Sequence, residues 1–212
     1  MSSITQAKRP RMAAADRRSA ILEAARLAFA AGGYHEVSLG AVAERAGVSK
    51  ALLYEHFDSK RELYEAMLEL HVRELIARIS EAASAAEPGE ARMRAGLEAF
   101  FAFVEERRGS WRIMFRNIGD PGVAASLDRL RDVVAAAIAA LMAEDAEAAF
   151  PGEPELQRIV EMHAQQLMGA MQSLADWWDA HPDVPRSQVM HAAMDSAWIG
   201  HERLSGGERW SG

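Results

Sequence analysis

The stretch SLGAVAERAGVSKALLYEHFDSK, residues 38–60, determines the fold that we expect for this chain. It contains two short helical runs joined at an Ala-Gly-Val sequence, where Gly47 can adopt the positive φ that a sharp turn needs. Ser38 and Ser49 each precede a helical run directly, at the position where N-cap residues are favoured. Ala43 is small, so the two helices can cross closely. The pattern predicts a helix-turn-helix, which typically lays its second helix in the major groove of DNA.

The second helix of this pair has one apolar side. Leu53 and Phe57 are four residues apart, so both face the interior of a helical domain. The side chains between and before them then face outward. These candidates for contact with a partner are Lys50, Leu52, Tyr54 and His56.

The flanking sequence is helical in both directions. A helix is expected from Asp16 to the pair Gly32-Gly33, because glycine accepts the left-handed conformation that ends helices. Another begins at Ser59, where Ser59 and Glu62 form a capping box in which each satisfies the other's backbone N–H, and it continues to about Ser80. Four further helices are expected at about 90–108, 111–117, 155–180 and 187–204, and a fifth in the alanine-rich stretch that follows the break at Asp120-Pro121-Gly122 and ends at about Ala149. No useful stretch alternates with period two, so we expect an all-α fold of about nine helices.

The expected elements divide the chain in two. We expect an N-terminal three-helix DNA-binding domain with the helix-turn-helix, and a C-terminal helical domain. The four expected segments are a disordered basic arm over 1–15, the helix-turn-helix domain over 16–61, the second domain over 62–204 and a frayed tail over 205–212.

Charge is distributed unevenly along the chain. The net charge is −7, yet residues 1–61 hold ten basic and six acidic side chains, giving +4 there and −11 in the remainder. A basic end on an acidic body favours a nucleic-acid partner for that end, although chance clustering on a solvated surface explains it almost as well. The basic run from Lys8 to Arg11 suits the minor groove of DNA or a solvated tail equally.

The composition limits the class of protein. There is no cysteine, which excludes disulfides and thiolate metal sites. No apolar run of about 18 residues occurs, and the polar start does not have the form of a secretory signal. We therefore expect a soluble cytoplasmic protein without a membrane partner.

The helix-turn-helix resembles that of the TetR family of bacterial regulators, and the resemblance covers about residues 16–68. The family's pattern is matched by Ser38, Val42-Ala43, Ala46-Gly47-Val48, Leu53-Tyr54, His56-Phe57 and Lys60, and upstream by residues 21–25, Phe29 and Gly32-Gly33-Tyr34. The chain departs from the pattern at Gly40-Ala41, at Ala51-Leu52 and at Glu55, whose carboxylate a phosphate would repel. These departures leave the operator sequence undetermined.

The resemblance implies a set of DNA-contacting residues. Tyr54 and Lys60 are expected to bind phosphates, although Tyr54 as a half-buried core residue and Lys60 as a plain solvated charge remain open. The full expected set is Ser38, Ser49, Lys50, Ala51, Leu52, Tyr54, His56 and Lys60.

The resemblance also implies a homodimer and a small-molecule effector. The last two long helices would form the dimer interface, with Gln165, Met168, Gly169, Gln172, Ala193, Ala197 and Gly200 on the outward side. An apolar or amphipathic effector would bind between helices of the second domain, and the helix from Ser59 to about Ser80 would transmit the change. The expected ligand-binding residues, any of which can equally be core, are Phe103, Trp111, Phe115, His163, Gln166, Met171 and Trp177.

These expectations combine into a transcriptional regulator, more often a repressor in this family, that binds a palindromic operator and is released by its ligand. We expect no catalytic activity, cofactor or metal, because the P-loop, Gly-x-Ser-x-Gly and His-Glu-x-x-His motifs are all missing from the sequence. His71 and Glu74 are spaced to share a metal but stand alone. The alternative is a helical protein-interaction module without DNA binding.

Overall fold

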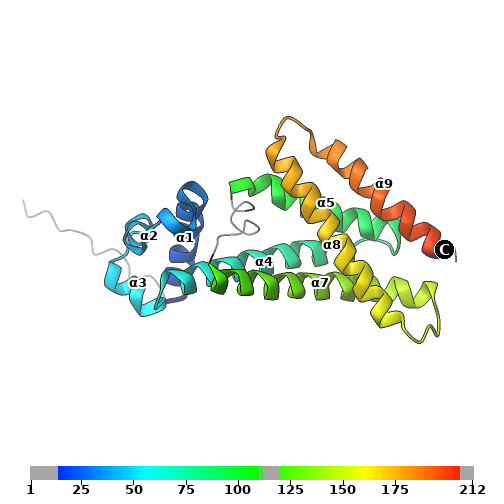
Figure 1. Ribbon diagram of the computed structural model, residues 1–212, viewed down its shortest axis with the longest axis horizontal. Helices are drawn as coiled ribbons and strands as arrows, with labels where there is room; N and C mark the ends of the chain where they lie inside the picture. Colours follow the sequence, from blue (N-terminus) through cyan, green and yellow to red (C-terminus); the bar gives the residue numbers. More distant parts are fainter. Residues whose placement is uncertain (1–13, 110, 112–119, 206–212) are drawn as a thin grey trace, which may run out of the picture. The chain divides into compact units, whose positions relative to one another are not determined.

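The computed structural model describes residues 14–109, 111 and 120–205, and this part of the chain forms eight helices and no strand (Figure 1). The all-α prediction is confirmed. Of the helix expected over 111–117 only Trp111 is described, and the basic arm up to residue 13 and the tail from 206 lie outside the described residues. The helices are α1 (Ala14–Glu36), α2 (Leu39–Ala46), α3 (Lys50–His56), α4 (Lys60–Ser84), α5 (Glu90–Glu106), α7 (Pro121–Ala149), α8 (Leu156–Ala180) and α9 (Arg186–Ser205).

The chain divides into two compact units, a first unit of Met1–Met67 and a second unit of Leu68–Gly212. The division falls inside α4, a few residues beyond the expected boundary at 61 and 62. The first turns of α4 belong to the first unit because Leu63, Tyr64 and Met67 are buried there. The Tyr64 ring packs edge-on against Phe29, with 5.1 Å between the ring centroids.

Serine caps and one glycine shape the helix-turn-helix of the first unit. Ser38 Oγ accepts a hydrogen bond from the Ala41 N–H at 3.2 Å, and Ser49 Oγ accepts one from the Leu52 N–H at 3.1 Å. Gly47 ends α2 with φ 68°, in the left-handed region. These are the roles that the sequence predicted for the three residues.

One local prediction is confirmed and another needs correction. Gly33 breaks the helical conformation as expected, with φ 75° and ψ 168°, and a short helical segment follows it to Glu36 within α1. Ser59 Oγ accepts from the Glu62 N–H at 3.1 Å as a capping box requires, whereas the Glu62 carboxylate accepts from the Asp58 N–H at 2.6 Å. The expected donor to the Glu62 carboxylate was the Ser59 N–H, and the carboxylate instead accepts from the residue before it. Only one of the two hydrogen bonds of a capping box is therefore formed.

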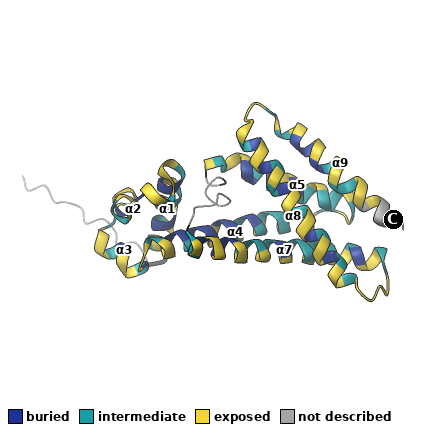
Figure 2. Cartoon of the chain, in the orientation of Figure 1, coloured by how far each residue is buried: buried dark blue, intermediate teal, exposed yellow. Residues whose placement is uncertain are grey.

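The second unit has its own apolar core, built by α5, α8 and α9 around two tryptophans. Trp111 and Trp178 are almost fully buried, and the Trp178 N–H donates to the Val184 carbonyl at 2.7 Å. Figure 2 shows the buried sides of these helices in dark blue and long exposed stripes on α8 and α9. The core residues are Leu97, Phe101, Val104, Trp111, Met171, Ala175, Trp178, Val189, Met190 and Ala193.

Candidate functional site

The outer side of α3 is the candidate nucleic-acid interface. Leu53 is fully buried, and Phe57, which follows the helix, is 1% exposed, as the four-residue spacing predicted. Lys50, Ala51 and Tyr54 are exposed instead, with Tyr54 at 45%, while Leu52 and His56 are partly exposed. A half-buried core position for Tyr54 is therefore wrong. The outer side of α3 therefore carries the ammonium group of Lys50, the phenol hydroxyl of Tyr54 and the imidazole of His56.

Lys50 and Tyr54 act as a pair on this side. The Lys50 Nζ lies 5.9 Å from the centroid of the Tyr54 ring, within the range of a cation–π contact. A positive charge beside a phenol hydroxyl suits phosphate, because both groups donate hydrogen bonds to its oxygens. Glu55 is exposed on the same helix and opposes an anion, so contact with DNA must keep this carboxylate away from phosphates.

Ser38 and Ser49 are exposed at the starts of α2 and α3. Each hydroxyl oxygen accepts a backbone N–H as an N-cap, and this bond leaves the hydroxyl hydrogen able to donate outward. A capping serine can therefore contact a phosphate without giving up its structural role.

Lys60 has a structural role that sequence reasoning missed. Its Nζ donates to the His35 carbonyl at 2.9 Å and to the Val37 carbonyl at 3.1 Å, and lies 4.9 Å from the Tyr34 ring centroid. The side chain thus ties the start of α4 to the end of α1 and to the residue that follows it. The partners precede Lys60 by 25 and 23 residues, so local spacing carried no signal for this bond. A plain solvated charge is wrong for Lys60.

A narrow cavity of about 130 Å³ lies between α4, α5, α7 and α8 of the second unit. Helical rows line it, because side chains three or four residues apart share one side of a helix. On α4 these are Leu68, Val72, Leu75, Ile79 and Ala83, and on α7 they include Leu127, Leu130, Val134, Ile138, Leu141 and Met142. The sequence analysis missed both rows, although their spacing was visible in the sequence.

Only some of the expected ligand-binding residues line this cavity. Trp111 and Met171 do, whereas Phe115 lies outside the described residues. The remaining four are absent from the described lining of the cavity: Phe103, His163, Gln166 and Trp177.

The positions of these side chains explain their absence from the lining. Phe103 is fully buried, with the guanidinium carbons of Arg78 and Arg107 each 5.5 Å from its ring centroid. Trp177 is 47% exposed and stacks on His181 at 4.2 Å between centroids. The side chains of α8 that line the cavity are Leu167, Met168, Met171 and Gln172. Positions 163, 166 and 177 of the same helix are not part of this described lining.

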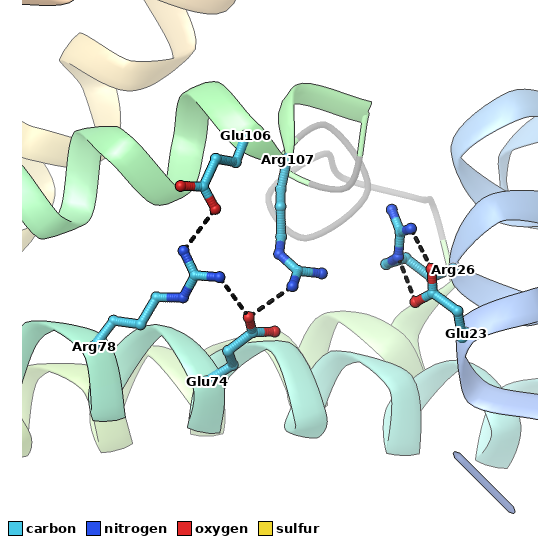
Figure 3. Close-up of polar contacts among 6 residues, drawn as sticks. All are labelled: Glu23, Arg26, Glu74, Arg78, Glu106 and Arg107. Atoms are coloured by element: carbon cyan, nitrogen blue, oxygen red, sulfur yellow. Dashed lines mark hydrogen bonds and ion pairs between the residues drawn. The ribbon is translucent and has the colours of Figure 1, made fainter. Parts of the chain in front are cut away.

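The guanidinium groups over Phe103 belong to a polar network between α4 and the end of α5 (Figure 3). Glu74 accepts from Arg78 at 2.9 Å and from Arg107 at 2.6 Å, and Arg78 also donates to Glu106 at 2.6 Å. The hydrogen bond and charge of Arg78 hold the pKa of Glu106 below its ordinary value. Figure 3 also shows the bidentate pair of Glu23 and Arg26 within α1.

The outward side of α8 and α9 agrees with the expected dimer surface only in part. Gly169 and Gly200 are exposed, and a Cβ added to either would meet nothing within 4 Å. Met168 and Gln172 line the cavity instead, and Ala193 is fully buried in the core. Large apolar side chains are exposed on both helices, namely Met162, Trp177 and Ile199.

Neither a metal site nor a membrane-spanning helix is found within the described ranges. No three His, Asp or Glu side chains there are grouped closely enough to hold a metal ion. None of the described helices is both long enough and apolar enough to cross a membrane.

Two family models match the sequence. The model described as "Bacterial regulatory proteins, tetR family" matches residues 21–67, and the model described as "Tetracyclin repressor-like, C-terminal domain" matches residues 89–200. The HTH-type transcriptional activator FasR of Mycolicibacterium smegmatis is 38% identical over 132 residues, which span 61% of this chain and 60% of FasR. The match therefore covers less than two thirds of that relative.

Solved structures share the fold over most of their length. A TetR-like transcriptional regulator from Rhodococcus sp. RHA1 has 27% identity and a TM-score of 0.68, covering 91% of this chain and 99% of that one. FadR from Bacillus subtilis, solved in complex with stearoyl-CoA, has 14% identity and a TM-score of 0.70, with 90% and 99% covered. At that identity, the likeness to FadR is one of fold.

Proposed function

The chain belongs to the TetR family of bacterial regulators, and on this premise we propose that it is a transcriptional regulator that binds operator DNA through α3. One observation carries the proposal: α3 buries Leu53 and exposes Lys50 and Tyr54 together on its outer side. The proposed contacts also include the hydroxyls of Ser38 and Ser49, and Ala51, Leu52 and His56 beside them. Lys60 adds its charge near phosphates while its ammonium holds two backbone carbonyls.

The regulator works as a homodimer on a palindromic operator. One helix of seven residues reads too few bases for specificity, and two copies related by a two-fold axis read two half-sites about 34–36 Å apart. The exposed sides of α8 and α9 support an interface there, because they combine Met162, Trp177 and Ile199 with glycines that allow helices to approach closely.

A small apolar or amphipathic effector binds in the cavity of the second unit and releases the operator. Support comes from the long rows of aliphatic side chains on α4 and α7, which suit a slender apolar molecule. FadR, which shares the fold, holds stearoyl-CoA, a ligand with a long acyl chain. Helix α4 belongs to both units and lines the cavity with Leu68, Val72 and Leu75, so it links ligand and DNA. The ligand acts by binding better to the form that does not fit DNA.

Repression is the role proposed first, since release from DNA by a ligand then turns transcription on. Activation is the second candidate, because the relative FasR is named an activator. A reporter gene behind the operator separates them: deleting the regulator raises expression for a repressor and lowers it for an activator.

Selection of bound fragments from the source genome tests the proposal. The wild-type chain should enrich short palindromic sites, and a Lys50→Ala, Tyr54→Phe variant should enrich none while keeping its helical content. If the folded wild type enriches no site at low salt, DNA binding is refuted, and the helical protein-interaction module becomes the better account.

A further inference from the structure

Arg92 is a charged side chain in the lining of the proposed effector cavity, near the start of α5 and the end of α7. It lies on the first turn of α5, lines the cavity and is 14% exposed. One of its terminal nitrogens, Nη1, donates to Asp145 Oδ1 at 2.8 Å and to Glu144 Oε2 at 3.1 Å. The other Asp145 oxygen accepts from the Gly89 N–H at 3.0 Å, so Asp145 joins the start of α5 to the end of α7.

The Nε–H of Arg92 has no such partner. The atom is buried, and no hydrogen-bond acceptor reaches it within the described part of the chain. Leaving a buried donor unsatisfied costs about 1–3 kcal/mol, so an acceptor that enters the cavity gains by meeting it. Because the guanidinium group is planar and Asp145 fixes its Nη1, the Nε–H cannot turn toward another partner without loss of the ion pair.

The surrounding charges decide which acceptor fits. Arg92 carries one positive charge and faces two carboxylates, of Asp145 and of Glu144. A carboxylate on the ligand would add a third negative charge beside them and be repelled. A carbonyl oxygen of an ester, thioester or amide accepts the Nε–H without adding charge.

The shape of the cavity fixes the rest of the ligand. Arg131, the other cationic lining residue among those described, lies 14 positions before Asp145 on α7, a separation of about 21 Å along a helix. Aliphatic side chains such as Val134 and Ile138 line the wall between these two positions. The cavity is therefore elongated, apolar along its length and polar at its ends.

We propose that Arg92 is a specificity-determining residue that donates its Nε–H to a neutral carbonyl oxygen on an elongated apolar effector, and that Asp145 and Glu144 discriminate against free carboxylates. The inference rests on the proposed function of the cavity as the effector site. It adds the chemical class of the ligand, a medium- or long-chain acyl ester, thioester or amide.

Binding of methyl decanoate and of decanoate to the full chain tests the inference, because these probes differ only in the head group. Tryptophan fluorescence reports binding, since Trp111 lines the cavity. At pH 8 we expect the ester to bind at least about tenfold more tightly, in line with one hydrogen bond to a charged donor. The Asp145→Asn variant should reduce the ratio of ester affinity to acid affinity, because the carboxylate of decanoate can then pair with Arg92.

Two further variants separate a specific contact from a general loss of structure. Arg92→Met combined with Asp145→Asn removes the donor and leaves no buried charge unpaired, and it should weaken ester binding about tenfold. Arg131→Met, at the other end of the cavity, should leave the ester-to-acid ratio unchanged within about twofold.

The inference is overturned if wild type binds decanoate as tightly as the ester, or if the double variant keeps full affinity for the ester. In both cases the cavity still binds apolar ligands, so the proposed effector site survives. If neither probe binds to wild-type protein that binds DNA, the acyl class of ligand is refuted and the role of Arg92 falls with it, and the proposed effector site loses its support from acyl ligands.

Discussion

Lys60 illustrates how a side chain on the candidate DNA-binding unit can serve the fold first. Its ammonium donates to the carbonyl of His35, in the last turn of α1, and to that of Val37, just beyond α1. Both carbonyls would otherwise depend on water. An experiment that removes Lys60 therefore perturbs stability together with any phosphate contact. Lys50, which is exposed and contacts only the Tyr54 ring in the described structure, is the better test of DNA binding.

The first prediction concerns Lys60 itself. Lys60→Met should lower the free energy of unfolding of the first unit by about 1–2 kcal/mol, because two hydrogen bonds from a charged donor are lost at a partly exposed site. Urea denaturation followed by circular dichroism measures the change. Lys50→Met is the matched control and should stay within about 0.5 kcal/mol of wild type. Equal stability of both variants would contradict the structural role of Lys60.

At the residue scale the sequence was informative where periodicity applied. The four-residue spacing of Leu53 and Phe57 predicted which side of α3 is buried, and this is confirmed. Aromatic residues of the second unit were less predictable. Phe103 and Trp177 look equivalent in composition, yet one is buried under two arginines and the other is exposed beside His181. Contacts between distant parts of the chain decide these positions, and local spacing does not contain them.

Among the elements, the turn between α2 and α3 depends on Gly47. Its φ of 68° lies in the left-handed region, where a Cβ is strained even though nothing stands within 4 Å of it. Gly47→Ala should therefore lower the free energy of unfolding by about 1 kcal/mol. Gly40→Ala, inside α2, has the opposite expected sign, because alanine favours a helix interior by about 0.5–1 kcal/mol and its Cβ would make only an ordinary 3.7 Å contact. Thermal unfolding gives the melting temperature of both variants. If both melting temperatures shift in the same direction, the difference in backbone conformation between Gly47 and Gly40 does not determine stability.

The polar network between α4 and α5 gives a pH-dependent prediction. The pKa of Glu106 is lowered chiefly because Arg78 donates a hydrogen bond to its carboxylate, with the Arg78 charge next. A lowered pKa in the folded state adds stability above the ordinary pKa of a glutamate, and this is lost as pH falls through the lowered value. Glu106→Gln should thus lower the melting temperature slightly near pH 7, and by less near pH 3. An effect of equal size at both pH values would mean that packing, and not charge, links Glu106 to Arg78.

Some element boundaries were predictable from caps and breaks, as the starts of α2 and α3 show. Asp-Pro-Gly was expected to break the helical pattern, but Asp120 Oδ1 accepts from the N–H groups of Gly122 and Val123, so α7 begins within this sequence, at Pro121. The reach of Glu62 to Asp58 was not predictable, because the side chain has two nearby backbone donors and only packing selects one. The rows lining the cavity could have been found from their spacing, but aliphatic residues at helical spacing predict core equally well.

For the whole molecule, the basic end and the acidic remainder correspond to the two units only approximately, since the first unit ends at Met67. The dimer is the feature that a single chain reveals least, because an exposed apolar side chain has the same appearance with or without a partner. The exposed sides of α8 and α9 are nevertheless specific enough to be tested.

Gly169→Trp should prevent dimer formation without unfolding the chain, since an added side chain there meets open space within one protomer and would collide with a partner. Sedimentation velocity should show a dimer for wild type and a monomer for the variant. Ala148→Trp, on the exposed side of α7, is the control and should remain dimeric. A dimeric Gly169→Trp chain would place the interface elsewhere.

The salt dependence of operator binding tests the central claim, that α3 binds DNA through its exposed side. For wild type, Lys50→Ala and Arg94→Ala, the logarithm of the binding constant is measured against the logarithm of salt concentration. Lys50→Ala should bind more weakly and reduce the slope by about one per protomer, because one phosphate-contacting charge is lost. Arg94→Ala removes an equal charge at an exposed position of α5, outside the proposed DNA, dimer and effector surfaces, and should match wild type. If Lys50→Ala keeps the wild-type affinity and slope, α3 does not bind DNA in this way and the account is contradicted.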